Sequence, residues 1–346
     1  MLKSIKIILL LFIGTLAVSF IYYKYSGTIR GKNGFVRDFS QVRVMLQNTA
    51  MIESRNYSFA NISRDSFSLY EYKKPYHILN FSTDLKRRSD QNLAPMTEIQ
   101  KADGMNSVSL FGPKEIVVVG RASKAYSFDK ESGKMDSTTL DSLYVYQAEI
   151  VSPTSFVYIR EAYIQGERRS QIVKRNWGAK TIKIYVPEKQ FDGIISTDGQ
   201  FRIDQNSGSI IFMFYYRGEL IRLDSNLKVL YKSKTIDTVT QANIRLRNLG
   251  FNTQKIATPP SVINKRICVA NNKIFVQSNL ISDFEDTKTF RSSDVIDIYD
   301  FTNGKYSSSF YLPKYGKQKL NEFMIDKGLL IAIYSNRVAV FKIRGI

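Results

Sequence analysis

The chain has 346 residues, with 50 Lys and Arg against 31 Asp and Glu, and it contains one His, one Cys and one Trp. One His and one Cys exclude a Cys/His zinc site, a CxxC redox pair and an intramolecular disulfide. The sequence also has no GxGxxG, P-loop, HExxH or GxSxG motif. We therefore expect neither a metal nor a cofactor.

The net charge of +19 is spread along the chain. The excess lies in residues 1–50, 151–250 and 301–346, and not in one basic tail. A positive surface attracts anionic membranes, nucleic acid or acidic glycans. Nucleic acid is the least favoured of these partners, because the first segment of the chain indicates a location outside the cytoplasm.

That first segment, residues 7–23, is uncharged and mostly apolar, with Lys3 and Lys6 before it and Lys24 after it. Its length lies between a signal-peptide core and a bilayer-spanning helix. No small-residue cleavage site follows it clearly. We expect residues 1–24 to be an uncleaved single-pass membrane anchor, with a cleaved signal sequence as the alternative. Residues 25–33 would then be a linker, and residues 34–346 a domain in the periplasm or outside the cell.

From residue 60 onward, short alternating or apolar runs are separated by turn residues, which is typical of an all-β domain. One unit recurs: a strand, a polar turn and a second strand rich in Lys and Ser. Its complete copies are Ile78–Arg88, Ala125–Met135, Ile182–Phe191, Leu220–Leu230 and Ile296–Tyr306.

A sixth copy begins at Arg337–Ile343, but the chain ends before its second strand. Successive copies are 47, 56, 39, 77 and 42 residues apart, and most of these spacings are close to the length of one four-stranded propeller blade. The pattern predicts a β-propeller with six four-stranded blades. An N-terminal strand such as Gly34–Val44 could complete the last blade and close the ring, which would leave no sheet edge exposed. The alternatives are a two-sheet sandwich or two smaller β domains, and a propeller of five or seven blades.

On these repeats, the sequence resembles the six-bladed propellers of the broad NHL, TolB or YncE-like kind found in exported bacterial proteins. The resemblance covers roughly residues 34–346 and is architectural. Neither a WD dipeptide with its GH partner nor a kelch Gly-Gly is present, so no functional residues are carried over. The longest interval contains extra material in residues 235–262, and its core, Val239–Phe251, is expected to form a short helix in a loop between blades.

Candidate functional residues are sparse. His77 and Cys268 lie in strand-like sequence and are expected to be structural. The acids of Ser282–Asp286, with Asp294, Asp297 and Asp300, could act as a Ca²⁺ site or a glycosidase pair, although no EF-hand spacing is present. The densest basic stretch suits a polyanion or glycan, or only a solvated hairpin. Its candidate binding residues are Arg168, Arg169, Lys174, Arg175 and Trp177.

Three hypotheses for function follow. The first is a non-enzymatic, membrane-tethered propeller that binds a protein, peptide or glycan on one face. The second is a propeller enzyme that acts on glycans with carboxylates and tyrosines. The third is a structural subunit of an envelope complex. A pocket with two convergent acids would indicate the enzyme, and a flat apolar patch on a blade would indicate the subunit.

Overall fold

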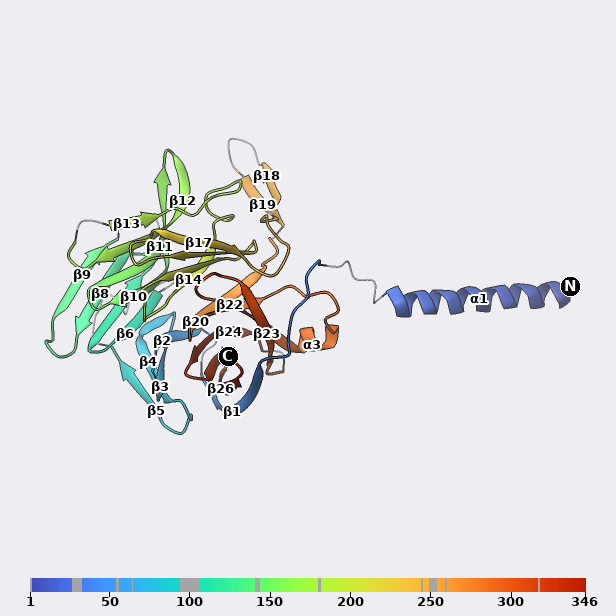
Figure 1. Cartoon of the computed structure of the whole chain (residues 1–346), viewed down its shortest axis with the longest axis horizontal. Coiled ribbons are helices and arrows are strands. Elements are labelled where there is room, and N and C mark those ends of the chain that lie inside the picture. The colour runs from blue at the N-terminus through green and yellow to red at the C-terminus, as the bar shows by residue number, and fades with distance from the viewer. Residues whose placement is uncertain are drawn as a thin grey trace.

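The computed structural model describes residues 2–26, 33–53, 56–63, 65–93, 106–140, 144–179, 182–243, 245–248, 254–258, 260–316 and 318–346. The first element is the helix α1 (Leu2–Ser26), which extends away from the rest of the molecule (Figure 1). The sequence predicts a transmembrane helix here. Among the described residues, however, no helix meets the requirements of length and apolar character for crossing a membrane.

Six four-stranded antiparallel sheets follow, each with its strands paired in the order of a propeller blade (Figure 1). Blade 1 contains β2 (Tyr57–Ile62), β3 (Ser66–Glu71), β4 (Lys74–Ser82) and β5 (Arg88–Asn92). Blade 2 contains β6 (Asn106–Phe111), β7 (Lys114–Val119), β8 (Lys124–Asp129) and β9 (Met135–Thr139). Blade 3 contains β10 (Tyr144–Ser152), β11 (Ser155–Ile164), β12 (Glu167–Asn176) and β13 (Ile182–Tyr185).

The second half of the chain builds the remaining blades. Blade 4 contains β14 (Gly199–Ile203), β15 (Ile210–Phe214), β16 (Glu219–Leu223) and β17 (Val229–Lys234). Blade 5 contains β20 (Asn264–Ala270), β21 (Lys273–Ser278), β22 (Ser293–Asp300) and β23 (Tyr306–Pro313), with the short helix α3 (Thr287–Ser292) between its second and third strands. Blade 6 contains β24 (Leu320–Asp326), β25 (Leu329–Tyr334), β26 (Arg337–Arg344) and β1 (Arg43–Met51). The predicted six-bladed, four-stranded propeller is confirmed.

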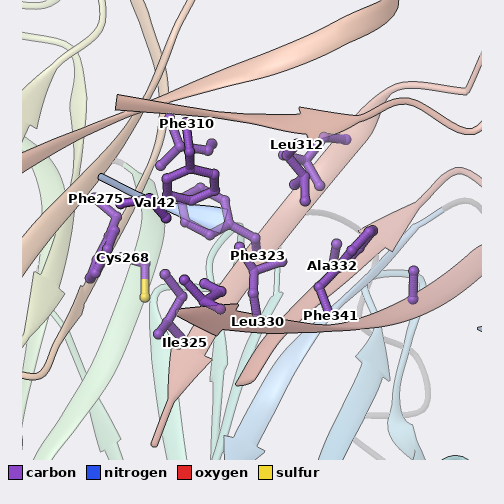
Figure 2. Close-up of a cluster of buried hydrophobic side chains, with 14 of the residues drawn as sticks. Val42, Cys268, Phe275, Phe310, Leu312, Phe323, Ile325, Leu330, Ala332 and Phe341 are labelled. Atoms are coloured by element: carbon purple, nitrogen blue, oxygen red, sulfur yellow. The ribbon is translucent and has the colours of Figure 1, made fainter. Parts of the chain in front are cut away.

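Apolar side chains hold neighbouring blades together. Each of the six junctions between blades, including that between blade 6 and blade 1, has its own cluster of buried side chains. Figure 2 shows the cluster between blades 5 and 6, in which Phe275 and Phe310 of blade 5 pack with Phe323 and Phe341 of blade 6. The second strand of each blade is buried on both faces, which explains why these strands read as continuous apolar runs.

The fourth strand of blade 6 comes from the N-terminal part of the chain. β1 pairs antiparallel with β26, and Arg43 lies opposite Arg344 while Met51 lies opposite Arg337. The sequence predicts this strand at residues 34–44, and the structure places it later, at Arg43–Met51. The physical reason is that residues 33–42 pack against blade 5 and so cannot pair with blade 6.

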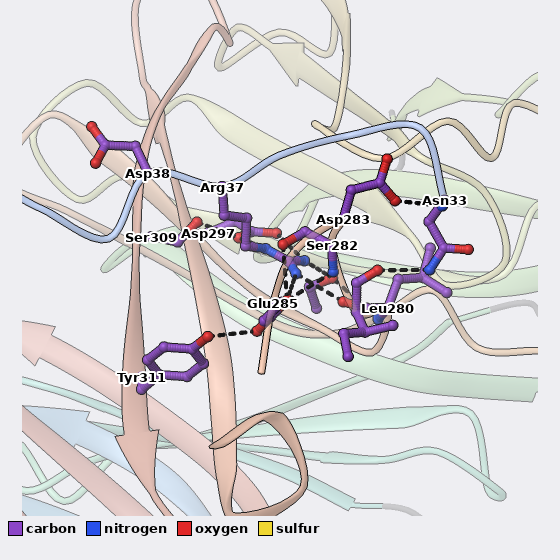
Figure 3. Close-up of polar contacts among 12 residues, drawn as sticks. Asn33, Arg37, Asp38, Leu280, Ser282, Asp283, Glu285, Asp297, Ser309 and Tyr311 are labelled. Atoms are coloured by element: carbon purple, nitrogen blue, oxygen red, sulfur yellow. Dashed lines mark hydrogen bonds and ion pairs between the residues drawn. The ribbon is translucent and has the colours of Figure 1, made fainter. Parts of the chain in front are cut away.

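Residues 33–42, which we call the strap, lie against blade 5 (Figure 3). The buried guanidinium of Arg37 donates from Nε to Asp297 Oδ1 at 2.7 Å and from Nη1 to Glu285 Oε2 at 2.9 Å. The backbone of Asp38 accepts a hydrogen bond from the Ser309 nitrogen at 2.7 Å. The ring of Phe39 stacks on Tyr311, with centroids 4.2 Å apart. The strap therefore covers the outer strand of blade 5 before β1 joins blade 6.

Two local predictions are wrong. The helix expected within Val239–Phe251 is instead the strand β18 (Arg245–Asn248), which pairs with β19 (Gln254–Thr258). Its apolar positions alternate with basic residues, a period of two that suits a strand better than a helix. The repeat copy at Ile182–Phe191 begins on the fourth strand of blade 3, whereas the other copies begin on third strands. The second and third strands of blade 3 have ten residues each. The sequence that matches the repeat therefore falls on the fourth strand of this blade and not on the third.

Candidate functional site

Charged side chains from different blades meet at the centre of the propeller. Arg202 on β14 donates through its two terminal nitrogens to Glu149 on β10 and to Glu322 on β24. Glu322 also accepts hydrogen bonds from the Ser58 hydroxyl and from the Phe59 nitrogen on β2. We call Ser58, Glu149, Arg202 and Glu322 the channel cluster, and it connects four of the six innermost strands.

Arg202 is suited to this position because its planar guanidinium can hold two carboxylates at fixed angles. The side chains of Arg202 and Glu322 are 12% and 9% exposed. Burial lowers the pKa of Arg202, but the two carboxylates outweigh burial and raise it. The buried Arg202 Nε has no hydrogen-bond partner among the described residues. A buried charge destabilises a protein unless it is paired. The ion pairs of Arg202 with Glu149 and Glu322 therefore fix these side chains in place, and we call this layer of paired charges the charged floor.

A second set of polar residues lies at one end of the innermost strands. In each antiparallel blade, the first strand begins at the end where the second strand finishes. Asp198 precedes the first strand β14, Arg266 lies near the start of the first strand β20, and Tyr72 and Tyr215 follow the second strands β3 and β15. We call these four residues the channel mouth. Burial raises the pKa of Tyr72 and of Tyr215, and the nearby cations Arg266 and Arg202 act against burial at both tyrosines.

Arg266 and Asp198 give the mouth opposite charges. Arg266 donates from Nη1 to the Lys265 carbonyl at 2.8 Å and from Nε to the Asn321 carbonyl, and it forms no ion pair within the described parts of the chain. Burial, together with the nearby carboxylates of Glu161 and Asp192, raises the pKa of Asp198 to about 6. With tyrosines between them, these groups can bind a ligand that presents both hydrogen-bond donors and acceptors.

The predicted basic residues lie along β12, and the structure does not bring them together as one patch. Arg168 contacts Glu161, and Arg169 Nη1 lies 3.7 Å from a Glu167 oxygen. Lys174 Nζ donates to the Ser225 carbonyl of blade 4 at 2.7 Å, whereas Arg175 Nη1 donates to the Thr139 carbonyl of blade 2 at 2.7 Å. Alternate residues of a strand face opposite sides, so Lys174 and Arg175 bridge blade 3 to different neighbours.

The last residue of the predicted set, Trp177, lies after the other end of β12. Its ring packs against Phe156 with centroids 5.1 Å apart, and it is partly buried in the cluster between blades 2 and 3. Ten strand residues span about 30 Å, so Trp177 is far from Arg168. Of the predicted set, only Arg168 contacts Glu161, the acid whose charge raises the pKa of Asp198 at the channel mouth.

The acids considered as a metal or glycosidase site have structural partners. Asp297 and Glu285 bind Arg37, Asp283 accepts from the Asn33 nitrogen at 2.7 Å, and Asp286 caps α3 through the Thr289 nitrogen at 2.8 Å (Figure 3). Asp294 accepts from Gln277 Nε2 at 2.9 Å. In the described residues, no group of three His, Cys, Asp or Glu side chains could hold a metal ion.

The two single-copy residues lie elsewhere. Cys268 is fully buried between blades 5 and 6, and burial raises its pKa to about 12. His77 on β4 lies 3.9 Å from an Asp90 oxygen and lines an open cavity of about 660 Å³ on blade 1. Glu53, Glu71 and Lys74 also line this cavity. It lies on one blade and is separate from the channel cluster.

The channel cluster was not found from the sequence. Glu149, Arg202 and Glu322 each occupy one position in an ordinary alternating strand, and they meet only because the blades are arranged around a centre. The available signal was a charged residue within the first strand of three different blades.

Comparisons with known proteins support the fold. No family model matches the sequence, and no curated protein matches it either. A member of the DUF4221 family from Bacteroides vulgatus is similar in structure at 10% identity, with 88% of this chain and 99% of that chain covered and a TM-score of 0.57. A protein from Bacteroides fragilis whose name describes it as exported shares 8% identity over 90% and 97% of the two chains, with a TM-score of 0.52.

A streptogramin B lyase structure is also similar, with 10% identity, 89% and 100% of the chains covered, and a TM-score of 0.50. At these identities the likeness concerns the fold alone. The chain is a six-bladed β-propeller, as its repeats predicted.

Proposed function

We propose that this protein is a non-enzymatic binding platform outside the cytoplasm, and that its ligand binds at the channel mouth. The observation that carries the proposal is the convergence of Tyr72, Asp198, Tyr215 and Arg266 from three blades above a charged floor. The carboxylates of that floor are engaged by Arg202. This arrangement favours binding over glycoside hydrolysis, which uses two carboxyl groups in different roles, because the four residues of the mouth include one carboxyl group, that of Asp198.

The ligand class follows from the groups at the mouth. Tyrosine rings supply apolar faces with a polar hydroxyl, Arg266 binds acceptors and Asp198 binds donors. A peptide or glycan segment of a larger partner presents both kinds of group. Of the basic residues predicted from the sequence, Arg168 is the one that we connect with this ligand, because it contacts Glu161, whose charge raises the pKa of Asp198. Arg169, Lys174, Arg175 and Trp177 belong to the same proposal as an extension along β12.

The proposed location rests on α1. Apolar side chains around this helix are exposed, among them Leu11 at 66% and Phe20 at 67%. We propose that residues 7–23 contact a membrane and hold the propeller at its surface, on the periplasmic or external side. The similar protein from Bacteroides fragilis, described as exported, is in line with this location.

We also propose that the pairing of β1 with β26 closes the ring of blades and stabilises the propeller. Without β1, the edge of β26 would be open to other strands, because an unpaired edge offers free backbone hydrogen-bonding groups. The strap strengthens this closure, since Arg37 fixes the chain to blade 5 just before β1 begins.

Site-specific photo-crosslinking tests the proposed function. A benzophenone amino acid is placed at Tyr215 in the mouth, at Leu46 on the outer strand β1, and at Ile184 on the outer strand β13. In intact cells we expect one discrete adduct from Tyr215 that Arg266→Ala abolishes, and none from the two outer strands. An adduct from Leu46 or Ile184 alone would instead identify a structural subunit. The charge reversal R168E is expected to weaken the Tyr215 adduct, whereas R175E, at the far end of β12, is the matched control.

A further inference from the structure

An exposed aromatic residue lies beside the strap, in the loop between β21 and α3. Phe284 is 89% exposed, and its backbone has a φ of +65°. A bulky side chain rarely adopts this left-handed conformation. Strained backbone of this kind persists only where the surrounding structure imposes it, and it is often connected with function.

The strap imposes the conformation by binding both neighbours of Phe284. The Asp283 nitrogen donates to the Phe35 carbonyl at 2.8 Å, and the Asp283 carboxylate accepts from the Asn33 nitrogen at 2.7 Å. On the other side, Glu285 is held by Arg37 and accepts from the Ser282 nitrogen at 2.7 Å. With residues 283 and 285 fixed toward the strap, the ring between them is presented outward.

This loop lies close to the point where the chain leads to α1. Figure 1 shows α3, which follows the loop, on the side of the propeller from which α1 departs. Asn33, which binds Asp283, is seven residues after the end of α1, and seven residues span at most about 25 Å. If α1 contacts a membrane, the loop is therefore near the membrane surface.

The surroundings of Phe284 are predominantly basic. Lys288 and Arg291 on α3 are exposed, and Lys314 Nζ lies 3.0 Å from the Arg291 carbonyl. In the sequence between α1 and the strap, Arg30 and Lys32 occur without an acid, and Lys24 lies near the end of α1. The loop also has three acids: Glu285 is buried and paired with Arg37, which leaves Asp283 and Asp286 against Lys288, Arg291 and Lys314. The cations are therefore in slight excess. An exposed aromatic ring among cations matches the interface of an anionic bilayer.

We propose that Phe284 inserts into the headgroup region of an anionic membrane, with Lys288 and Arg291 against the lipid headgroups, so that the propeller docks on the membrane through this loop. This inference rests on the proposed membrane contact of α1 and goes further, because it fixes which side of the propeller faces the lipid. The loop acts as a second contact point in addition to the helix.

The test uses the full chain carrying Phe284→Cys, labelled with an environment-sensitive fluorophore. Cys268, the other cysteine, is fully buried and is not labelled in the folded protein. Vesicles contain phosphatidylcholine alone or with phosphatidylglycerol, and brominated acyl chains serve as quenchers. The matched control is Ile184→Cys, on β13 of blade 3 and 44% exposed.

We expect vesicles with phosphatidylglycerol to shift the label at position 284 to shorter wavelength, and brominated lipid to quench it at least twofold. The label at position 184 should be unaffected, and K288E/R291E should reduce the shift. If the protein binds vesicles but position 284 stays unquenched, the docking proposal is wrong while membrane contact through α1 stands. If the protein binds no vesicles, both proposals fail. A shift at position 284 caused only by an added protein would also overturn lipid docking.

Discussion

The guanidinium of Arg37 and the carboxylate of Asp297 form a buried, two-bonded ion pair between residues 260 positions apart, with Nε 2.7 Å from Oδ1 and Nη2 3.1 Å from Oδ2. Glu285 binds the same guanidinium, and the Ser309 hydroxyl donates to Asp297 at 2.6 Å (Figure 3). This pair attaches the segment that follows α1 to the fifth blade, and it fixes the loop that carries Phe284.

Removing the cation of this pair is predicted to destabilise the protein strongly. Arg37→Met leaves Asp297 and Glu285 buried without their charge partner, and breaking such a pair costs about 3–5 kcal/mol. Urea denaturation measures the loss. The control is Arg88→Ala, which removes an exposed pair with Glu53 and should cost about 0–1 kcal/mol. Equal effects of the two substitutions would contradict the structural role of Arg37.

The free energy of unfolding is predicted to depend on pH through the protonation of Asp198. Its folded-state pKa of about 6 exceeds the ordinary value of 3.8, so the folded state binds the proton more tightly than the unfolded state. The stabilisation by this proton is therefore complete below pH 3.8 and lost as the pH rises through 6. A shift of this size corresponds to about 3 kcal/mol. Asp198→Asn should be more stable than wild type at pH 8 by about 3 kcal/mol and similar to it at pH 4.

A matched variant separates this effect from general charge removal. Hydrogen bonds from Thr302 lower the pKa of Asp300, so Asp300→Asn should destabilise the protein at neutral pH, the opposite sign. Thermal unfolding between pH 4 and pH 8 measures both. A pH-independent difference between wild type and D198N would rule out the protonation of Asp198 as the cause.

Covalent closure of blade 6 is predicted to stabilise the fold. Arg43 and Arg344 are directly opposite on β1 and β26, both exposed and of like charge. The double substitution R43C/R344C removes this repulsion, and its disulfide closes a very long loop, for which about 2–5 kcal/mol is expected. The same variant in reductant is the control. No gain on oxidation would show that the pairing of β1 with β26 contributes little to closure.

Phe284→Gly is predicted to raise the stability of the protein. Glycine accepts positive φ without strain, so F284G should gain about 1 kcal/mol. F284A keeps a Cβ in the same backbone conformation and should leave stability close to wild type. Chemical denaturation of the two variants decides the point, and a loss with F284G equal to that with F284A would mean that the ring itself stabilises the loop.

The repeats carried enough information for the architecture, because third strands of similar length and pattern recur in nearly every blade. Blade 3 broke the pattern, since its long β11 and β12 moved the matching sequence at Ile182 onto the fourth strand. The N-terminal strand was predicted too early because residues 34–44 alternate like a strand. Alternation correctly indicates that Phe35 and Arg37 are buried. It does not show whether the segment is held by backbone pairing in a sheet or, as here, by side-chain contacts such as those of Arg37.

The candidate site was less accessible to sequence reasoning. Acids that are close in sequence, such as Asp283 and Glu285, suggested a site, yet their charges serve the strap. Residues far apart in sequence formed the channel cluster instead: Glu149, Arg202 and Glu322 have no local pattern in common. The basic run on β12 was recognised as dense, but a strand distributes its residues over two faces, so density in sequence did not become a patch in space.

The origin of blade 6 from both ends of the chain has a consequence for the timing of folding. β1 is synthesised before every blade, and its partner β26 follows all the others. During synthesis, β1 must therefore remain unpaired while five blades form, and the final blade is assembled in one late step. Contacts between such distant residues are slow to form. Proteolysis within Arg337–Arg344 would leave β1 without a partner, so only an intact chain can complete its last sheet.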